Sequence, residues 1–519
     1  MRNIKIITMI ALIYIIYLNA LQDDMVDTDR LTLDWYINYS WFKTNWGDDI
    51  VSKTISDKVG VDIEFITPIG HERDKFSSML KTNSLPDIIT LDWSSPYINE
   101  MLQKDMVYAL NELDELYNAG FQETSNIDSY NWYTQSDGNI YGYPNASYTP
   151  EHYQNYDNLS SNQVFMVRKD IYEALGSPDM STKDGFKQAV YDATRLFSTE
   201  DNPLIPIGST TFNEYGALSF DTYLQNFLAI PYEKNGLYYD RNTDVEYIEW
   251  LKVFNELFQE GYLLAEIFTD QRIQLEEKFA NGEYFCILYQ RTDITNQQQS
   301  LYLNKPDKIY MAVDGPKNSN GDNHILPGVG INGWTLTFIS KNCNNPQKAL
   351  ELITYMMSDE GQLLTAWGVE GETFDYVDEK PVFKEEVIEL LQTDRELFDK
   401  IYGSDYTYWM FQNYISKYEY KSPKIEPLAQ LEEWTYPYTE YTGQYEITFS
   451  DNVAMTNLNH KIQSLWGEYL IKLLISESEQ EFNQLLNEYI HNREQLGYYD
   501  LIQEINKRMA ISKKKLGMK

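Results

Sequence analysis

The chain has 519 residues and a formal net charge of −37 at pH 7. This length is too great for one ordinary core, so two lobes are expected. The strong negative charge excludes a nucleic-acid surface, because phosphates would be repelled. With 43% hydrophobic and 23% charged residues, the composition is that of a folded rather than a disordered chain.

The N-terminus predicts export. A short basic stretch, residues 1–5, precedes an almost unbroken apolar run over residues 6–18. This arrangement predicts that residues 1–22 are a signal peptide or an uncleaved N-terminal anchor. Residues 18–21 resemble the end of a bacterial lipoprotein signal, but Leu21 stands where the lipid-bearing Cys would be. We therefore expect the protein at the extracellular face of the cell membrane, either secreted or held by the uncleaved apolar segment.

Strands and helices alternate through the first hundred residues. The patterns predict strands at 31–37, 60–66 and 85–91, with helices at 47–59 and 72–82 between them. A β-α-β-α-β order predicts a mainly parallel sheet with helices on both faces.

Polar and aromatic residues follow two of these strands. Asn38, Ser40 and Trp41 come after the first strand, and Asp92 and Trp93 come after the third. In open α/β sheets, ligands bind beyond the carboxyl ends of the strands. These side chains are therefore predicted to face a crevice. For each Trp the alternative is core packing, and Asp92 has the alternative of capping the helix that begins near Pro96.

Two later stretches have the composition of connections between lobes. Residues 146–161 form a polar, Tyr-rich bridge without periodicity, and residues 314–324 consist of loop-forming residues throughout. Strong helical patterns return at 344–366 and 460–510. The chain shows neither an internal repeat nor a low-complexity tract.

Five motifs in order carry a resemblance to a known family. They are PDIITLD, DGNIYGYPN, VRKDIYEALGSPDMSTKDGF, GWTLTFISKNCNNPQKALELITYMMSDEGQ and WGVEGETFDY. Together they resemble the extracellular solute-binding proteins of family 1, the capture subunits of bacterial ABC sugar importers, in the long branch found in Firmicutes. The absence of Cys at position 21 departs from that pattern and puts the mode of membrane attachment in doubt.

The resemblance implies a two-lobed, periplasmic-binding-protein-like α/β fold of type II, with discontinuous lobes joined by a multi-segment hinge. Its crossings are expected near 145–160, 315 and 362. Lobe 1 would comprise residues 30–145 plus 316–362, and lobe 2 residues 146–315 plus 363–519.

The resemblance also implies ligand contacts, carried over position by position. The implied residues are Trp41, Asp92, Trp93, Tyr141, Asn162, Tyr289, Arg291, Trp334, Trp367 and Glu372. Tyr141 has hinge packing as its alternative role. Aromatic faces would cover the C–H patches of a sugar, and the polar groups would bond its hydroxyls.

The expected function is extracellular capture of a carbohydrate and its delivery to the membrane permease of an ABC importer. The many aromatic residues and few cations favour a neutral oligosaccharide, although Arg291 leaves an acidic sugar open. Peptide ligands are a more distant alternative. We expect a monomer without catalytic activity, metal or cofactor, and no nucleic-acid partner.

Other classes of protein are alternatives to this prediction. A sensor or adhesin that binds sugar without import would have the same lobes. A glycoside hydrolase would need two facing carboxylates, and 79 acidic residues supply such pairs by chance. No nucleophile-elbow, zinc-protease or phosphate-loop motif occurs, and Cys286 and Cys343 form neither a disulfide framework nor a metal-ligand spacing. The loop at 318–323 is better read as a solvated turn than as a calcium loop.

Overall fold

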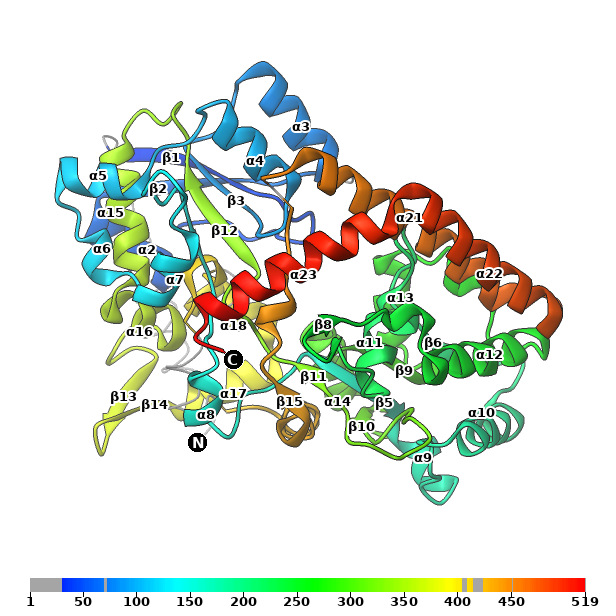
Figure 1. Cartoon of the computed structure of the whole chain (residues 1–519). Helices are drawn as coiled ribbons and strands as arrows, with labels where there is room; N and C mark the ends of the chain where they lie inside the picture. Colours follow the sequence, from blue (N-terminus) through cyan, green and yellow to red (C-terminus); the bar gives the residue numbers. More distant parts are fainter. Residues whose placement is uncertain (1–29, 70–71, 404–407, 414–422, 450, 519) are drawn as a thin grey trace, which may run out of the picture.

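The computed structural model describes residues 30–69, 72–403, 408–413, 423–449 and 451–518. The predicted signal segment, with Leu21, lies outside these residues. Within them the chain forms two lobes, each built on its own β-sheet with helices around it (Figure 1). The predicted two-lobed α/β fold is confirmed. No helix in the described part of the chain combines the length and apolar character needed to cross a membrane.

Lobe 1 is built on a five-stranded sheet with the order β2-β1-β3-β12-β4. β1 pairs in parallel with β2 and β3, whereas β12 runs antiparallel between β3 and β4. Its strands are β1 (Leu31–Ile37), β2 (Val61–Ile66), β3 (Ile88–Asp92), β4 (Gly142–Pro144) and β12 (Thr335–Ile339). Successive side chains of β1 alternate between two apolar clusters on opposite faces, with Trp35 and Ile37 in one and Tyr36 in the other.

Helices cover both faces of this sheet. The helix after β1 is fixed at both ends, because Asp49 accepts the backbone N–H groups of Val51 and Ser52 and Gly60 ends it at φ +80°. The helices of lobe 1 are α2 (Ile50–Val59), α3 (Glu72–Thr82), α4 (Pro96–Gln103), α5 (Leu110–Tyr117), α6 (Phe121–Thr124), α7 (Ile127–Tyr133), α15 (Pro346–Met357), α16 (Asp359–Trp367), α17 (Glu385–Thr393) and α18 (Arg395–Tyr402). A hairpin of β13 (Phe374–Val377) and β14 (Lys380–Phe383) lies between α16 and α17.

Lobe 2 is built on a four-stranded sheet with the order β10-β5-β9-β6. Its strands are β5 (Gln163–Arg168), β6 (Ile205–Gly208), β9 (Tyr284–Gln290) and β10 (Tyr310–Ala312), with a separate hairpin of β7 (Glu233–Lys234) and β8 (Leu237–Tyr238). Its helices are α9 (Lys169–Ala174), α10 (Lys183–Phe197), α11 (Thr222–Phe227), α12 (Val245–Gln259), α13 (Arg272–Ala280), α14 (Thr295–Asn304), α20 (Glu426–Glu433), α21 (Val453–Ile475), α22 (Glu479–Leu496) and α23 (Tyr498–Lys515). The largest apolar cluster joins this sheet to the C-terminal helices through Trp466 and Leu470.

The predicted lobe boundaries need one correction, at the third crossing. The chain was expected to cross to lobe 2 near 362, but Leu364 and residues 408–411 pack in the same cluster as Trp35 of β1. The last crossing therefore lies between Phe411, in the core of lobe 1, and α20, where Gln430 bonds to the backbone of β10. The resemblance implied a crossing near 362, whereas in this chain α16 remains in lobe 1.

Segments far apart in the sequence meet between the lobes. β11 (Leu326–Pro327) pairs in parallel with β15 (Thr439–Glu440). Ser161, at the end of the first crossing, joins both of them: its N–H donates to Thr439 Oγ1 at 3.0 Å, and its hydroxyl donates to the carbonyl of Pro327 at 2.7 Å. These three segments form the hinge region.

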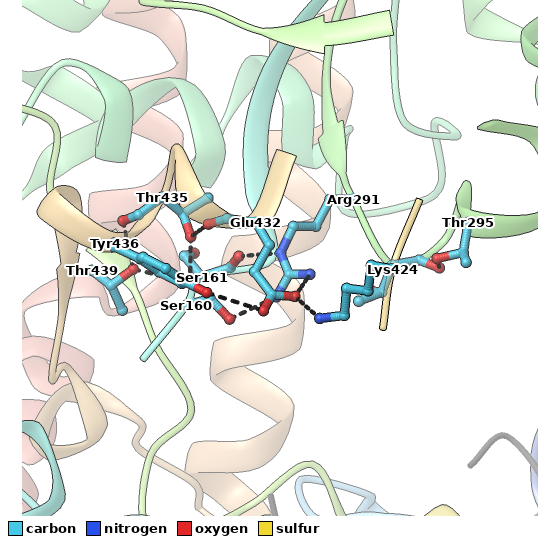
Figure 2. Close-up of polar contacts among 10 residues, drawn as sticks. Ser160, Ser161, Arg291, Thr295, Lys424, Glu432, Thr435, Tyr436 and Thr439 are labelled. Carbon is cyan, nitrogen blue, oxygen red and sulfur yellow. Dashed lines mark hydrogen bonds and ion pairs between the residues drawn. The ribbon is translucent and has the colours of Figure 1, made fainter. Parts of the chain in front are cut away.

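A largely buried ion pair ties this hinge region to lobe 2 (Figure 2). Arg291 follows β9, and its guanidinium donates to the Ser161 carbonyl at 2.9 Å, to Ser160 Oγ at 2.7 Å and to Glu432 Oε2 of α20 at 2.9 Å. Burial raises the pKa of Glu432, but the charges of Arg291 and Lys424 outweigh it and hold the pKa below its ordinary value. Each side chain of the pair is 13% exposed.

In each sheet, strand pairing places the strand ends that lead into the crossings side by side. In lobe 1 the start of β12 lies beside the end of β3, because Thr335 pairs with Asp92. In lobe 2 the start of β5 lies beside the end of β9, because Gln163 pairs with Gln290. The first two crossings leave or enter the sheets at these edges. The carboxyl ends of β1, β3 and β9 therefore lie on the side where the lobes meet.

Replacing Glu432 by Gln tests the hinge ion pair. The change leaves the Arg291 guanidinium buried without a full negative charge, so we expect the free energy of unfolding at pH 7 to fall by about 1.5–3 kcal/mol. Because the pKa of Glu432 is lowered in the folded state, this stabilisation exists above its unfolded pKa and is lost as pH falls through its folded value. Urea denaturation at pH 7 and pH 4 measures both effects.

The exposed neighbour Glu433 supplies a matched control, since Glu433→Gln removes the same charge from the same helix. Equal stability of the two variants at pH 7 would contradict the structural role of the pair.

Candidate functional site

An aromatic cluster lies beyond the carboxyl end of β1. The ring centroids of Trp334 and Trp409 are 4.3 Å apart, Tyr39 lies 5.6 Å from Trp334, and Trp41 lies 5.8 Å from Trp409. Tyr39, Trp41 and Trp334 are partly buried, whereas Trp409 is fully buried beneath them. We call these four residues the aromatic cluster. Its three partly exposed rings can offer apolar, polarisable surface to a flat ligand face.

A polar network lies at the same edge of the sheet. Glu446 Oε2 accepts the side-chain N–H of Asn332 at 3.0 Å, and Asn332 Oδ1 accepts the indole N–H of Trp132 at 2.7 Å. The hydroxyl of Tyr133 donates to the Asn332 carbonyl at 2.8 Å. The network therefore joins α7 of lobe 1, the second crossing and the segment that follows β15.

The carboxyl group of Glu446 is unusual because it is partly buried and forms no ion pair with any residue that the structure describes. Burial raises its pKa to about 7, and only the hydrogen bond from Asn332 opposes this. Burial, with the charges of Glu446 and Asp92, holds the pKa of Tyr133 well above its ordinary value. A Cβ atom on Gly330 would lie 2.5 Å from Glu446 Oε2, so any larger residue there would displace this carboxyl group. Glu446 therefore changes charge near neutral pH.

Asp92 and Trp93 lie where the sequence placed them, at the end of β3. Asp92 Oδ1 accepts the backbone N–H of Ser94 at 2.8 Å and its hydroxyl at 2.6 Å. The N-cap of α4 is Ser95, so Asp92 closes a turn before the helix and is not its cap. The backbone N–H of Trp93 donates to the carbonyl of Trp334 at 3.3 Å, and both indoles are partly buried. Trp41, Asp92, Trp93 and Trp334 are thus brought to one edge.

The predicted residues of lobe 2 are placed differently. The guanidinium of Arg291 is engaged by Glu432 and the first crossing. The backbone N–H of Arg291 donates to the carbonyl of Asn162, whose side chain is exposed. Tyr289 is 5% exposed and belongs to an apolar cluster of lobe 2. Tyr141, in lobe 1, donates its hydroxyl to Asp137 at 2.8 Å. Ligand contact by these residues stays a prediction. The contacts of Arg291 join the end of β9 to the first crossing and to α20.

Trp367 and Glu372 lie apart from the aromatic cluster. Trp367 is 5% exposed and packs on Phe383 of β14, with ring centroids 4.6 Å apart, in a small cluster formed by α16, α17, α18 and the hairpin. Glu372 is exposed in the turn before β13. The structure thus separates this pair from the other predicted residues, because α16 continues along lobe 1.

Sequence reasoning missed six residues at this edge: Tyr39, Trp132, Tyr133, Asn332, Trp409 and Glu446. Two of them had an available signal, since Tyr39 stands between Asn38 and Trp41, and Asn332 stands two residues before Trp334. Trp409 and Glu446 lie in stretches without periodicity, and only the tertiary fold brings them here.

Replacing Glu446 by Gln tests its raised pKa. A carboxyl whose pKa is about 7 when folded and 4.5 in its ordinary state binds a proton more tightly in the folded protein. Its contribution to stability is fully present below the unfolded pKa and is lost as pH rises through about 7. We expect the wild type to lose on the order of 2–3 kcal/mol between pH 4.5 and pH 8 through this group, and Glu446→Gln to lack that loss.

Denaturation across this pH range is the measurement. Glu372→Gln, at an exposed carboxylate, is the control and should keep the wild-type pH profile. An unchanged profile in Glu446→Gln would rule out Glu446 as the titrating group.

Comparison with solved structures establishes the fold. The S. pneumoniae ABC-transporter substrate-binding protein FusA, solved with kestose, has 15% sequence identity and a TM-score of 0.70, with 92% of this chain and 99% of FusA covered. An extracellular solute-binding protein from Bifidobacterium longum subsp. infantis has 14% identity and a TM-score of 0.68, with 93% and 98% covered. The alginate-binding protein AlgQ2, solved without calcium ion, has 18% identity and a TM-score of 0.67, with 93% and 98% covered.

Comparison with protein families establishes the membership of the chain. No curated protein matches it. The family model described as bacterial extracellular solute-binding protein matches residues 52–371, which is more than half of the chain. This range begins in α2 of lobe 1, takes in the sheet of lobe 2 and returns to lobe 1. The chain belongs to the bacterial extracellular solute-binding protein family.

Proposed function

We propose that the protein captures a carbohydrate, preferably a neutral oligosaccharide, between its lobes and delivers it to the permease of an ABC importer. The observation that carries the proposal is the aromatic cluster, which lies beside hydrogen-bonding side chains at the carboxyl ends of β1 and β3. Partly exposed indoles next to carboxyl and amide groups suit a ligand with apolar C–H faces and a rim of hydroxyls. The protein would be exported, held at or released from the extracellular face, and would act as a monomer.

The charges at the site favour a neutral over an acidic sugar. Asp92 and Glu446 both lie near Tyr133, whose pKa they raise. Arg291, the predicted cation of the site, is engaged by Glu432 at 2.9 Å. A uronate would therefore meet carboxylates rather than a guanidinium, at a cost in Coulomb energy.

The structural relatives support a carbohydrate ligand. FusA was solved with kestose, and the N-glycan transport solute-binding protein NgtS of S. pneumoniae was solved with Man1GlcNAc. AlgQ2 is described as an alginate-binding protein, so the test below also includes acidic glycans. Transfer to a permease would follow from lobe closure, since closure around a bound ligand changes the outer surface that a partner reads.

A second candidate function has one observation in its favour. A carboxyl with a raised pKa near a second carboxylate is also what a glycoside hydrolase uses. The family to which the chain belongs captures solutes, so we propose binding without turnover. A sensor or adhesin without import would share the same site, and co-purification of permease subunits distinguishes import from those roles.

The test is a thermal-shift screen of the chain from residue 23 onward against neutral and acidic oligosaccharides. A ligand of the folded state at a hundredfold excess over Kd stabilises it by about 2.7 kcal/mol. We expect a shift with a neutral oligosaccharide, recovered intact after prolonged incubation. A well-folded protein that responds to no glycan would contradict the proposal, and recovery of cleaved glycan would favour the hydrolase.

Replacing Trp334 by Ala tests where the ligand binds. Loss of one aromatic face should weaken binding of that glycan by about tenfold, as measured by calorimetry. Tyr376→Ala, at an exposed aromatic residue of β13, is the control and should bind like the wild type. Equal affinities of the two variants would place the ligand elsewhere.

A further inference from the structure

The last helix, α23, is anchored on lobe 2 and on the chain beside the hinge region. The side chain of Asn506 accepts the backbone N–H of Tyr238 in β8 at 2.7 Å. Arg508 donates to the carbonyl of Thr448 at 2.7 Å and forms an ion pair with Asp451 at 2.7 Å. These contacts fix the helix axis relative to lobe 2, so α23 is expected to move with that lobe.

The end of α23 nevertheless reaches lobe 1 (Figure 1). Lys515, its last residue, places Nζ 5.2 Å from the centroid of the Trp132 ring and 3.5 Å from the Trp132 carbonyl oxygen. Trp132 belongs to α7, which packs on the core of lobe 1 through Tyr130 and Tyr133. Lys515 therefore joins a helix of lobe 2 to a helix of lobe 1.

Lys513, two residues earlier, is directed to the other lobe and forms an ion pair with Glu233 of β7. An α-helix turns by about 100° per residue, so residues two apart point to nearly opposite sides. Lys513 therefore holds the helix end on lobe 2, while Lys515 faces α7. Lys514, between them, is exposed. The C-terminal turn also favours cations through the helix dipole.

The contact is coupled to the candidate site through Trp132. Lys515 meets the ring and the carbonyl of this residue, and the indole N–H donates to Asn332 at 2.7 Å. Asn332 in turn holds the carboxyl group of Glu446. Movement of α7 away from α23 would break the Lys515 contact without breaking those of Lys513.

We propose that the end of α23 is an interlobe strap, in which Lys515 holds α7 against a helix fixed to lobe 2. A contact made in one arrangement of the lobes and lost in another shifts the population toward the first. The inference rests on the proposed function in one respect: the strap would regulate that site, because apparent affinity follows the fraction of molecules in the binding-competent arrangement. The strap itself acts without ligand.

The test measures the distance between the lobes in the full chain without ligand. Spin labels are attached at Glu115→Cys in lobe 1 and Asp201→Cys in lobe 2, both exposed positions, while the native Cys286 and Cys343 are buried. Pulsed electron–electron double resonance then reports the distribution of distances between the two labels. A cation–π contact at an exposed site predicts that Lys515→Ala reduces the ratio of strapped to unstrapped molecules by about two- to fivefold.

Matched variants make the outcome specific. Lys515→Arg keeps a cation over the ring and should retain the wild-type distribution, and Lys514→Ala removes the same charge one residue away and should leave it unchanged. The proposal is overturned if Lys515→Ala matches the wild type, or if Lys514→Ala shifts the distribution equally. Because no ligand is present, failure here is independent of whether the protein binds a carbohydrate.

Discussion

The two lobes depend on a hinge region that one largely buried ion pair ties to lobe 2. Arg291 and Glu432 lie far apart in the sequence, yet their contact, together with the bonds of Ser161, joins β9, the first crossing and α20. A buried pair of this kind contributes little over apolar packing, but removing either partner is costly, so the segments are held in one register. Strand pairing within each sheet then places the carboxyl ends of β1, β3 and β9 on the side where the lobes meet.

The chemistry of the candidate site follows from the two groups of side chains that lie at the carboxyl ends of β1 and β3. The aromatic cluster supplies apolar ring faces, and the network of Trp132, Asn332 and Glu446 supplies hydrogen bonds. Glu446 has no cation beside it within the described residues, and a charged carboxylate in a partly buried position destabilises the folded state. Groups with strongly shifted pKa values are enriched at functional sites, and burial raises the pKa of Glu446 to about 7.

Much of the fold could be predicted from local patterns in the sequence. The strands of lobe 1 and the positions of Asp92 and Trp93 followed from apolar alternation and from the residues that end each strand. Arg291 was harder, because the partner that decides its role, Glu432, is distant in the sequence. Trp367 was harder because it packs on Phe383 of the following hairpin. Trp409 and Glu446 carry no local signal, and only the tertiary fold brings them to the site.

Hydrogen exchange of the whole protein, with and without a bound neutral oligosaccharide, tests the central claim most directly. If the ligand binds between the lobes at the aromatic cluster, protection should rise together at residues 38–42, 92–95, 330–334 and 408–412, which lie far apart in the sequence. Protection confined to the outer helices or to the β13–β14 hairpin, with these four segments unchanged, would contradict the account.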